Sequence, residues 1–249
     1  MPEYDASTYG ERIASIYDEW YREADPAMID LLAGLADGGP TLELGIGSGR
    51  VAIPLVERGV PVEGVDASAA MVTRLHAKPI GASIRVTLGD FRDVPVSGRF
   101  RLVYVVFNTF FALLTQEDQV RCFERVAELL EPDGVFVLEV FVPDTGRFRN
   151  GGNSNTTRVS ADTAMLDLSR HDPVTQRVDT QHVVFRHGGM ELYPVQIRYA
   201  WPAELDLMAR LAGLELKSRH AGWKQEPFSA ASGIHVSVYG RSPGNAEPA

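Results

Sequence analysis

The chain has 249 residues, of which 45% are hydrophobic and 23% charged, a composition that is ordinary for a folded globular protein. Its 24 Lys and Arg residues are outnumbered by 33 Asp and Glu residues, and the net charge of −9 makes nucleic acid an unfavourable partner. We find no apolar run of membrane-spanning length and no signal peptide, so we expect a cytoplasmic protein without a membrane partner.

Two helices are predicted before the first strand. Residues 8–21 place apolar and aromatic side chains on one helical face. Pro26 begins a second helix, which ends before Gly38. We interpret the whole segment, residues 1–40, as a helical lid, although a helix packed permanently on the domain would explain the same pattern.

Four tyrosines crowd this segment: Tyr4, Tyr9, Tyr17 and Tyr21. A tyrosine combines a flat apolar ring with a polar tip, which suits the wall of a pocket. We therefore take Tyr17 as a candidate catalytic residue, and Tyr9 and Tyr21 as candidate residues of a substrate pocket.

The most informative stretch is residues 41–49, Thr-Leu-Glu-Leu-Gly-Ile-Gly-Ser-Gly. Its apolar start predicts a buried strand, its three glycines predict a tight turn, and the apolar-periodic run that follows predicts a helix. Such a turn presents backbone N–H groups and a helix N-terminus to a ligand, which a side chain in place of glycine would keep away. In the dinucleotide-binding pattern Gly-x-Gly-x-x-Gly, the third glycine would stand where this chain has Arg50.

Strand–helix units continue along the chain. A capping box, residues 115–118, begins the helix that the turn at residues 131–134 ends. The strand at residues 102–106 is a continuous apolar run, as expected for a strand buried on both faces. We expect an α/β domain of residues 41–150 and 201–241, whose first five strands lie at residues 41–45, 61–66, 84–88, 102–106 and 135–141.

The hydrophobic period changes after residue 150. Glycine-rich residues 151–155 suggest a flexible joint, and residues 156–200 suggest antiparallel strands. We predict that residues 151–200 are an inserted antiparallel β meander. Its last strand has an apolar face, which must be buried, so we expect the meander to cover the substrate pocket or to form a homodimer interface.

The rest of the chain returns to the α/β pattern. A helix is predicted from Pro202, followed by strands at residues 214–219 and 234–239. The tail, residues 242–249, is rich in Pro, Gly and polar residues, and we expect it to be disordered.

Asp66 ends the second strand, at a distance from the glycine loop close to the ~20 residues found in dinucleotide enzymes. A carboxylate at this place can accept hydrogen bonds from the hydroxyl groups of a ribose. An acid that only caps the following helix is the alternative.

These features resemble those of class I S-adenosylmethionine-dependent methyltransferases of the bacterial small-molecule type, which act on metabolites and natural products. The pattern Glu-x-Gly-x-Gly-x-Gly that begins at Glu43 is similar to their first motif. Asp90 and Phe91 are similar to the motif in which an acid accepts a hydrogen bond from the adenine amino group and the next N–H meets the ring. Met71 matches their apolar contact to adenine.

The resemblance implies a fold, a cofactor and a set of binding residues. The expected fold is α/β, a Rossmann-like doubly wound seven-stranded sheet whose last strand is antiparallel, with the helical lid and the inserted meander added. The expected cofactor is S-adenosylmethionine, with S-adenosylhomocysteine as the product. The residues expected to hold it are Glu43, Gly45, Gly47, Gly49, Asp66, Ala67, Met71, Asp90, Phe91 and Asn108.

The same topology suggests substrate-pocket residues near the C-terminus. If the last strand is antiparallel, its start lies at the ligand-binding edge of the sheet, so the preceding loop, with Trp223 and Phe228, is expected to overhang the pocket. His235 would then lie at the rim as a candidate catalytic base, with a structural histidine as the alternative. Phe111, in the aromatic tract after the fourth strand, is a further candidate for the pocket.

Neither a metal site nor a cysteine nucleophile is predicted. The remaining histidines show no ligand spacing. Cys122 is the single cysteine, so no internal disulfide is possible, and its helical pattern indicates a small core residue.

The leading hypothesis is methyl transfer to an N, O, S or C atom of a small molecule by in-line displacement. An RNA methyltransferase is the alternative, against which stand the acidic charge and the lack of a basic, aromatic stripe. An NAD(P)-dependent oxidoreductase would favour glycine in place of Arg50. A non-catalytic binding protein also remains open.

Overall fold

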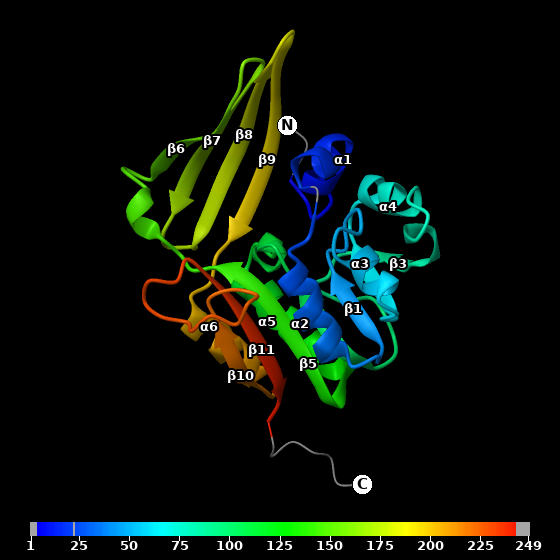
Figure 1. Ribbon diagram of the computed structural model, residues 1–249. Coiled ribbons are helices and arrows are strands. Elements are labelled where there is room, and N and C mark those ends of the chain that lie inside the picture. The colour runs from blue at the N-terminus through cyan, green and yellow to red at the C-terminus, as the bar shows by residue number, and fades with distance from the viewer. Residues whose placement is uncertain (1–3, 22, 243–249) are drawn as a thin grey trace.

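A seven-stranded sheet forms the centre of the structure, a computed structural model that describes residues 4–21 and 23–242 (Figure 1). The strand order is β10-β11-β5-β4-β1-β2-β3. The predicted disordered tail lies outside the described residues, apart from Ser242. In chain order the strands are β1 (Thr41–Leu44), β2 (Val62–Asp66), β3 (Arg85–Leu88), β4 (Phe100–Val105), β5 (Leu130–Phe141), β10 (Leu214–His220) and β11 (Ile234–Arg241).

One strand of this sheet, β11, runs antiparallel to its neighbours. It pairs antiparallel with both β5 and β10, whereas β4, β1, β2, β3 and β5 pair in parallel. The predicted seven-stranded sheet with an antiparallel last strand is therefore confirmed. Strands β1 and β4 lie in the middle and are almost wholly buried, which explains the continuous apolar run at residues 102–105 of β4.

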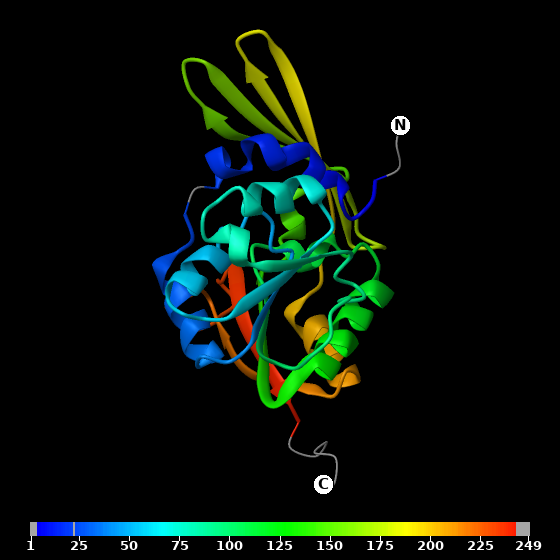
Figure 2. The same ribbon diagram turned by 90° about the vertical axis from the view of Figure 1, so that its right-hand side faces the viewer.

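Helices cover both faces of the sheet (Figure 2). Helices α2 (Pro26–Ala36) and α3 (Ala52–Glu57) pack against one face, and α5 (Gln116–Leu129) and α6 (Pro202–Leu211) against the other. Helix α4 (Ala69–His76) follows β2, and the short helices are η1 (Gly81–Ser83), η2 (Thr109–Ala112) and η3 (Thr145–Arg147). No helix among the described residues is long and apolar enough to span a membrane.

Strand β5 begins earlier than the sequence suggests. It starts at Leu130, directly after α5, so the turn predicted at residues 131–134 lies within the bounds of the strand, where the pairing with β4 shifts register between Leu130 and Val135. Leu130 pairs with Phe100 of β4. A Cβ on Gly134 would lie 2.7 Å from the Phe100 carbonyl oxygen, so glycine allows the chain to stay against β4 at this point.

The inserted segment forms a separate four-stranded sheet with the order β6-β7-β8-β9. All neighbours pair antiparallel, which confirms the meander. The predicted flexible joint at residues 151–155 is wrong, because β6 already pairs with β7 from Gly152. The strands are β6 (Gly152–Val159), β7 (Thr163–Asp172), β8 (Arg177–Arg186) and β9 (Gly189–Arg198).

Helix α1 (Thr8–Trp20) lies between the meander and the central domain (Figures 1 and 2). Its fully buried Ile13 packs with Val184 and Tyr193 of the meander. Tyr4 extends the contact, since its hydroxyl accepts a hydrogen bond from the Gln196 N–H at 3.2 Å. The apolar meander face predicted to need burial is therefore covered, at this end, by α1.

A buried ion pair joins the end of the meander to the central domain. The Arg198 guanidinium is 2.7 Å from a carboxylate oxygen of Glu204 in α6, and both side chains are largely buried. Arg198 also donates to the Gln119 side-chain oxygen at 2.7 Å. The point at which the chain leaves β9 is therefore fixed by charge as well as by packing.

Glu43 is a buried acid in the central strand β1. Its carboxylate accepts a 2.8 Å hydrogen bond from the Tyr104 hydroxyl of the neighbouring strand β4. Burial raises the pKa of Glu43 to about 8, although the Tyr104 hydroxyl and the nearby Arg50 oppose the shift. Glu43 is therefore mainly protonated at neutral pH.

We predict that Arg198→Met destabilises the protein by about 3–5 kcal/mol, because Glu204 would remain buried without its partner. Arg58→Met is the matched control, since Arg58 forms an exposed pair with Asp30 that is worth at most about 1 kcal/mol. Urea denaturation measures both changes. Equal losses of unfolding free energy would show that the buried pair does not fix the junction.

We predict a pH-dependent difference in stability between Glu43→Gln and the unsubstituted protein. The folded pKa of Glu43 exceeds its ordinary value of 4.5, so folding is favoured at low pH and this advantage is lost as the pH rises toward 8. The stability of Glu43→Gln relative to the original chain should therefore increase from pH 5 to pH 8, by up to about 1.4 kcal/mol per pH unit. Urea denaturation over this pH range measures the change, and the exposed Glu124→Gln is the control. The same pH dependence of unfolding free energy in both variants would contradict the raised pKa of Glu43.

Candidate functional site

The turn after β1 forms the floor of the site. Gly45, Gly47 and Gly49 all have positive φ angles, of 74°, 56° and 83°, which favour glycine. A Cβ on Gly45 would lie 2.5 Å from a methyl carbon of Thr109, so the turn approaches the end of β4 closely. A Cβ on Gly49 would collide with Leu75 of α4. Gly49 therefore serves the packing of α4 more than the approach of a ligand.

The Asp66 carboxylate joins this turn to the start of α4. One oxygen accepts from the Gly47 N–H at 2.7 Å and the other from the Ser68 N–H at 2.8 Å. Burial raises the pKa of Asp66 above its ordinary value, and these two N–H groups oppose the shift. Each carboxylate oxygen has a further lone pair that can accept a hydrogen bond from a ligand hydroxyl, so Asp66 can still make the predicted contact to a ribose.

A cavity lies along the carboxyl edge of the sheet, beneath α1. One wall comes from α1 and the residues before it, and the other from the ends of β1 to β4. The predicted residues that line it are Gly45, Gly47, Asp66, Ala67, Met71, Asp90, Phe91, Tyr9 and Tyr17. The sequence interpretation did not assign roles to other lining residues, among them Tyr4, Thr109 and Leu113.

Several predicted residues lie outside the wall of this cavity. Asn108 uses its side-chain oxygen to accept from the Phe141 N–H at 2.7 Å, so it ties the end of β4 to β5. Phe111 is fully buried in the core, with its ring 5.0 Å from that of Phe141. Glu43 lies below the turn, and Tyr21 lies beside the cavity against Phe107.

The C-terminal residues predicted for the pocket also lie elsewhere. Trp223 is buried with α2, and its indole N–H donates to Glu139 at 2.8 Å. His235 is fully buried, with its Nδ1 2.8 Å from the Ser237 hydroxyl and its ring against Phe228. Burial lowers the pKa of His235 to about 4. The prediction of a base at the pocket rim is therefore not met at this cavity, because Trp223 anchors the start of the preceding loop against α2 and Phe228 lies against His235.

Two acidic residues of α1 bind the segments that build the cavity. Glu11 accepts hydrogen bonds from the Ser68 hydroxyl at 2.9 Å and the Ala70 N–H at 3.0 Å, at the start of α4. Asp18 accepts from the Ser48 hydroxyl of the glycine turn at 2.6 Å and pairs with Arg74 at 3.0 Å. Sequence analysis missed both acids. Their seven-residue spacing, which places them on one helical face, was the available signal.

Aromatic rings fill the space between α1 and its neighbours. The Tyr17 and Tyr21 rings are 4.9 Å apart, and Tyr21 lies 5.0 Å from Phe107. Burial raises the pKa of Tyr9 and of Tyr17, so both hydroxyls stay protonated at neutral pH and can donate hydrogen bonds. Tyr17 is thus not suited to act as a general base.

The meander contributes an acid–histidine pair on the side that faces α1. His182 Nδ1 lies 2.5 Å from Asp167, and the His182 ring meets the ring of Trp20 edge-on. Sequence analysis found no role for His182. Among the described residues, no group of three or more His, Cys, Asp or Glu side chains is arranged to hold a metal ion. Cys122 is fully buried in the core, and burial raises the pKa of its thiol, so it is not a nucleophile.

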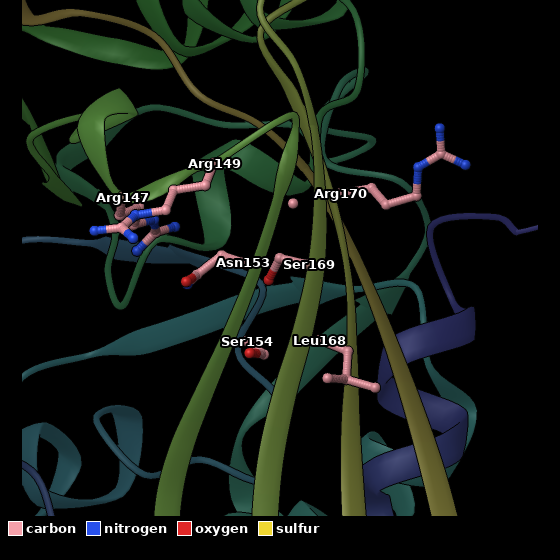
Figure 3. A pocket seen from close by; sticks show the side chains of 8 residues that line it. Arg147, Arg149, Asn153, Ser154, Leu168, Ser169 and Arg170 are labelled. Carbon is pink, nitrogen blue, oxygen red and sulfur yellow. The ribbon is translucent and has the colours of Figure 1, made fainter.

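A second, open hollow lies where η3 meets β6 and β7 (Figure 3). Arg147 and Arg149 point to one side, and Arg170 points away from them. The three arginines therefore do not converge on one ligand. None of the predicted site residues lines this hollow, and we place the functional site at the cavity beneath α1.

Comparisons with known proteins agree with this placement. Residues 41–134 match the protein family described as a methyltransferase domain. The cypemycin N-terminal methyltransferase of a Streptomyces species is 30% identical over 233 residues, which cover 88% of this chain and 94% of the relative.

Solved structures give the same assignment. The CcbJ methyltransferase of Streptomyces caelestis is 41% identical, with a TM-score of 0.90 over 96% of this chain and 100% of that one. CalS10, an amino pentose methyltransferase from Micromonospora echinaspora solved with S-adenosylmethionine, is 22% identical with a TM-score of 0.65 and supports the fold alone; it covers 90% of this chain and 96% of its own. The glycine turn, the two acids at the ends of β2 and β3, and these relatives lead to one conclusion: the chain belongs to the S-adenosylmethionine-dependent methyltransferases.

Proposed function

We propose that the protein transfers a methyl group from S-adenosylmethionine to an amine nitrogen of a small natural product or sugar. The observation that carries this proposal is the cavity between the glycine turn and the tyrosines of α1. The cypemycin relative supports nitrogen as the acceptor atom, since its name describes methylation at an N-terminus. A tyrosine-lined wall also suits a cationic or amine-bearing ligand.

The residues of the cavity fit the cofactor. Gly47 leaves room for close approach, since a Cβ there would come within 3.1 Å of the Met71 methyl carbon. Asp66 and Asp90 end neighbouring strands and line the cavity, which suits the ribose hydroxyls and the adenine amino group, and Asp90 is held in place by Arg92 at 2.8 Å. Met71 and Phe91 provide apolar surface beside them. We propose these roles for the four residues, and we no longer propose Asn108, whose side chain is engaged elsewhere.

Positioning is the main contribution of the protein to the reaction. When bound, S-adenosylmethionine supplies a methyl group that its sulfonium already activates. The chain must then hold the acceptor in line with the bond that breaks, which can lower the barrier by roughly 7–11 kcal/mol. We propose that Tyr9 and Tyr17 orient the acceptor by donating hydrogen bonds, and that α1 and the meander exclude water.

We also propose a role for each segment of the chain. Residues 4–21 act as the lid, residues 41–150 and 201–241 bind the cofactor, and residues 151–200 cover the acceptor. The predicted lid of residues 1–40 is too long, because α2 packs in the core of the central domain. The acidic net charge supports a small molecule rather than a nucleic acid as the partner. We also propose that the protein works in the cytoplasm. A homodimer would use a meander surface other than the one that α1 covers.

We predict that the protein, with S-adenosylmethionine, adds one methyl group to members of a panel of amino sugars and amine-bearing peptides. Asp66→Asn should weaken cofactor binding about 10- to 100-fold, because the amide cannot accept all the hydrogen bonds of the carboxylate. Mass spectrometry detects the product, and calorimetry measures the affinity. The exposed Asp30→Asn is the control. Unchanged affinity in a folded Asp66→Asn variant would contradict the cofactor site, and methylation of only hydroxyl or thiol acceptors would contradict the amine.

We predict that S-adenosylhomocysteine slows hydrogen exchange across residues 8–20. Glu11 and Asp18 bind the same two segments that hold the cofactor, so ordering those segments should also hold α1. Glu11→Gln should reduce this protection, whereas Glu19→Gln, which alters only a 3.6 Å pair with Arg186, should not. Identical exchange with and without the product would show that α1 is a fixed part of the fold and not a lid.

A further inference from the structure

Arg50 stands where the glycine turn passes into α3, and no role for it follows from the sites described above. The centre of its guanidinium lies 4.4 Å from the centroid of the Phe107 ring. Its Nε is buried without a hydrogen-bond partner among the described residues. Within that same part of the chain, no carboxylate lies within 4 Å of its nitrogen atoms. A buried donor of this kind is costly unless a ligand satisfies it.

The surroundings of Arg50 leave its positive charge largely uncompensated. Glu43 interacts electrostatically with Arg50 but is mainly protonated at neutral pH, because burial raises its pKa to about 8. On the other side Arg50 meets Tyr17, where its charge and hydrogen bond partly oppose the increase in the Tyr17 pKa that burial causes. Tyr17 itself lines the cavity. A cation thus lies behind the Tyr17 wall of the cavity, beside a neutral hydroxyl and against the Phe107 ring.

The two ends of the cavity differ in charge. Asp66 and Asp90, at the ends of β2 and β3, are acidic and suit the adenosine part of the cofactor. Asp90 is already paired with Arg92 at 2.8 Å, whereas Asp66 forms no ion pair among the described residues and would repel a carboxylate. The amino-acid part must then extend toward the ends of β1 and β4, where Gly45, Thr109 and Tyr17 line the cavity and Phe107 holds Arg50.

We propose that Arg50 binds the α-carboxylate of the methionine part of S-adenosylmethionine. A planar guanidinium pairs with a carboxylate through two hydrogen bonds, and stacking on Phe107 fixes its plane. Tyr17, whose pKa the charge of Arg50 lowers against the effect of burial, places this contact beside α1. The inference depends on the cofactor assignment and extends it to a residue of the turn.

The test compares S-adenosylmethionine with its decarboxylated form, which keeps the sulfonium and the amine and lacks only the carboxylate. Calorimetry measures the affinity of both ligands for the original chain and for Arg50→Gln. We expect Arg50→Gln to weaken S-adenosylmethionine binding about 10- to 100-fold and to leave binding of the decarboxylated ligand within about twofold. Arg50→Lys should restore part of the loss, because it keeps the charge without the planar fork.

Two controls separate this role from a structural one. Arg58→Gln removes an exposed arginine just after the same helix and should change neither affinity. If Arg50→Gln only distorts the turn, both ligands should lose affinity equally, and that result would overturn the proposal. Equal binding of the two ligands by the original chain would also overturn it, whereas binding of neither ligand would refute the cofactor site as a whole.

Discussion

The site depends on one carboxylate that holds two loops together. Asp66 binds the N–H of Gly47 in the glycine turn and the N–H of Ser68 at the start of α4, at 2.7 and 2.8 Å. The same two segments then receive the acids of α1, with Ser68 bound by Glu11 and Ser48 by Asp18. The floor of the cavity and the attachment of its roof therefore rest on the same short stretches of backbone, and a change in one is transmitted to the other.

Sequence patterns predicted the central domain well because its information is local. The buried strand β4 contains a continuous apolar run, and two of the helices between strands begin at side chains that cap them, Ser68 for α4 and Thr115 for α5. Positive φ angles at the three glycines of the turn require the residues that the sequence shows there. Most of the predicted cofactor residues line the cavity for the same reason, since all of them except Met71 of α4 lie at or just after the end of a strand whose position was predictable.

The failures concern contacts between segments that are distant along the chain. No local pattern shows that the Trp223 indole reaches Glu139, or that His235 lies beneath Phe228 in the core, so the C-terminal loop was wrongly placed over the pocket. From the sequence, Arg50 was interpreted only as the absence of the third glycine of the dinucleotide-binding pattern. Its partner Phe107 lies at the end of another strand, and the pairing becomes visible only when the sheet brings β1 and β4 together.

The meander leaves and rejoins the central domain at two places that lie close together, after β5 and at the Arg198–Glu204 pair before α6. Its strands hydrogen-bond among themselves and form no part of the seven-stranded sheet. Substitutions on its surface can therefore accumulate without disturbing the strands beneath. If the meander covers the acceptor, as we propose, such an arrangement allows that part of the protein to diversify during evolution while the part that meets the cofactor stays constant. One cofactor domain can thereby come to serve many different chemical scaffolds.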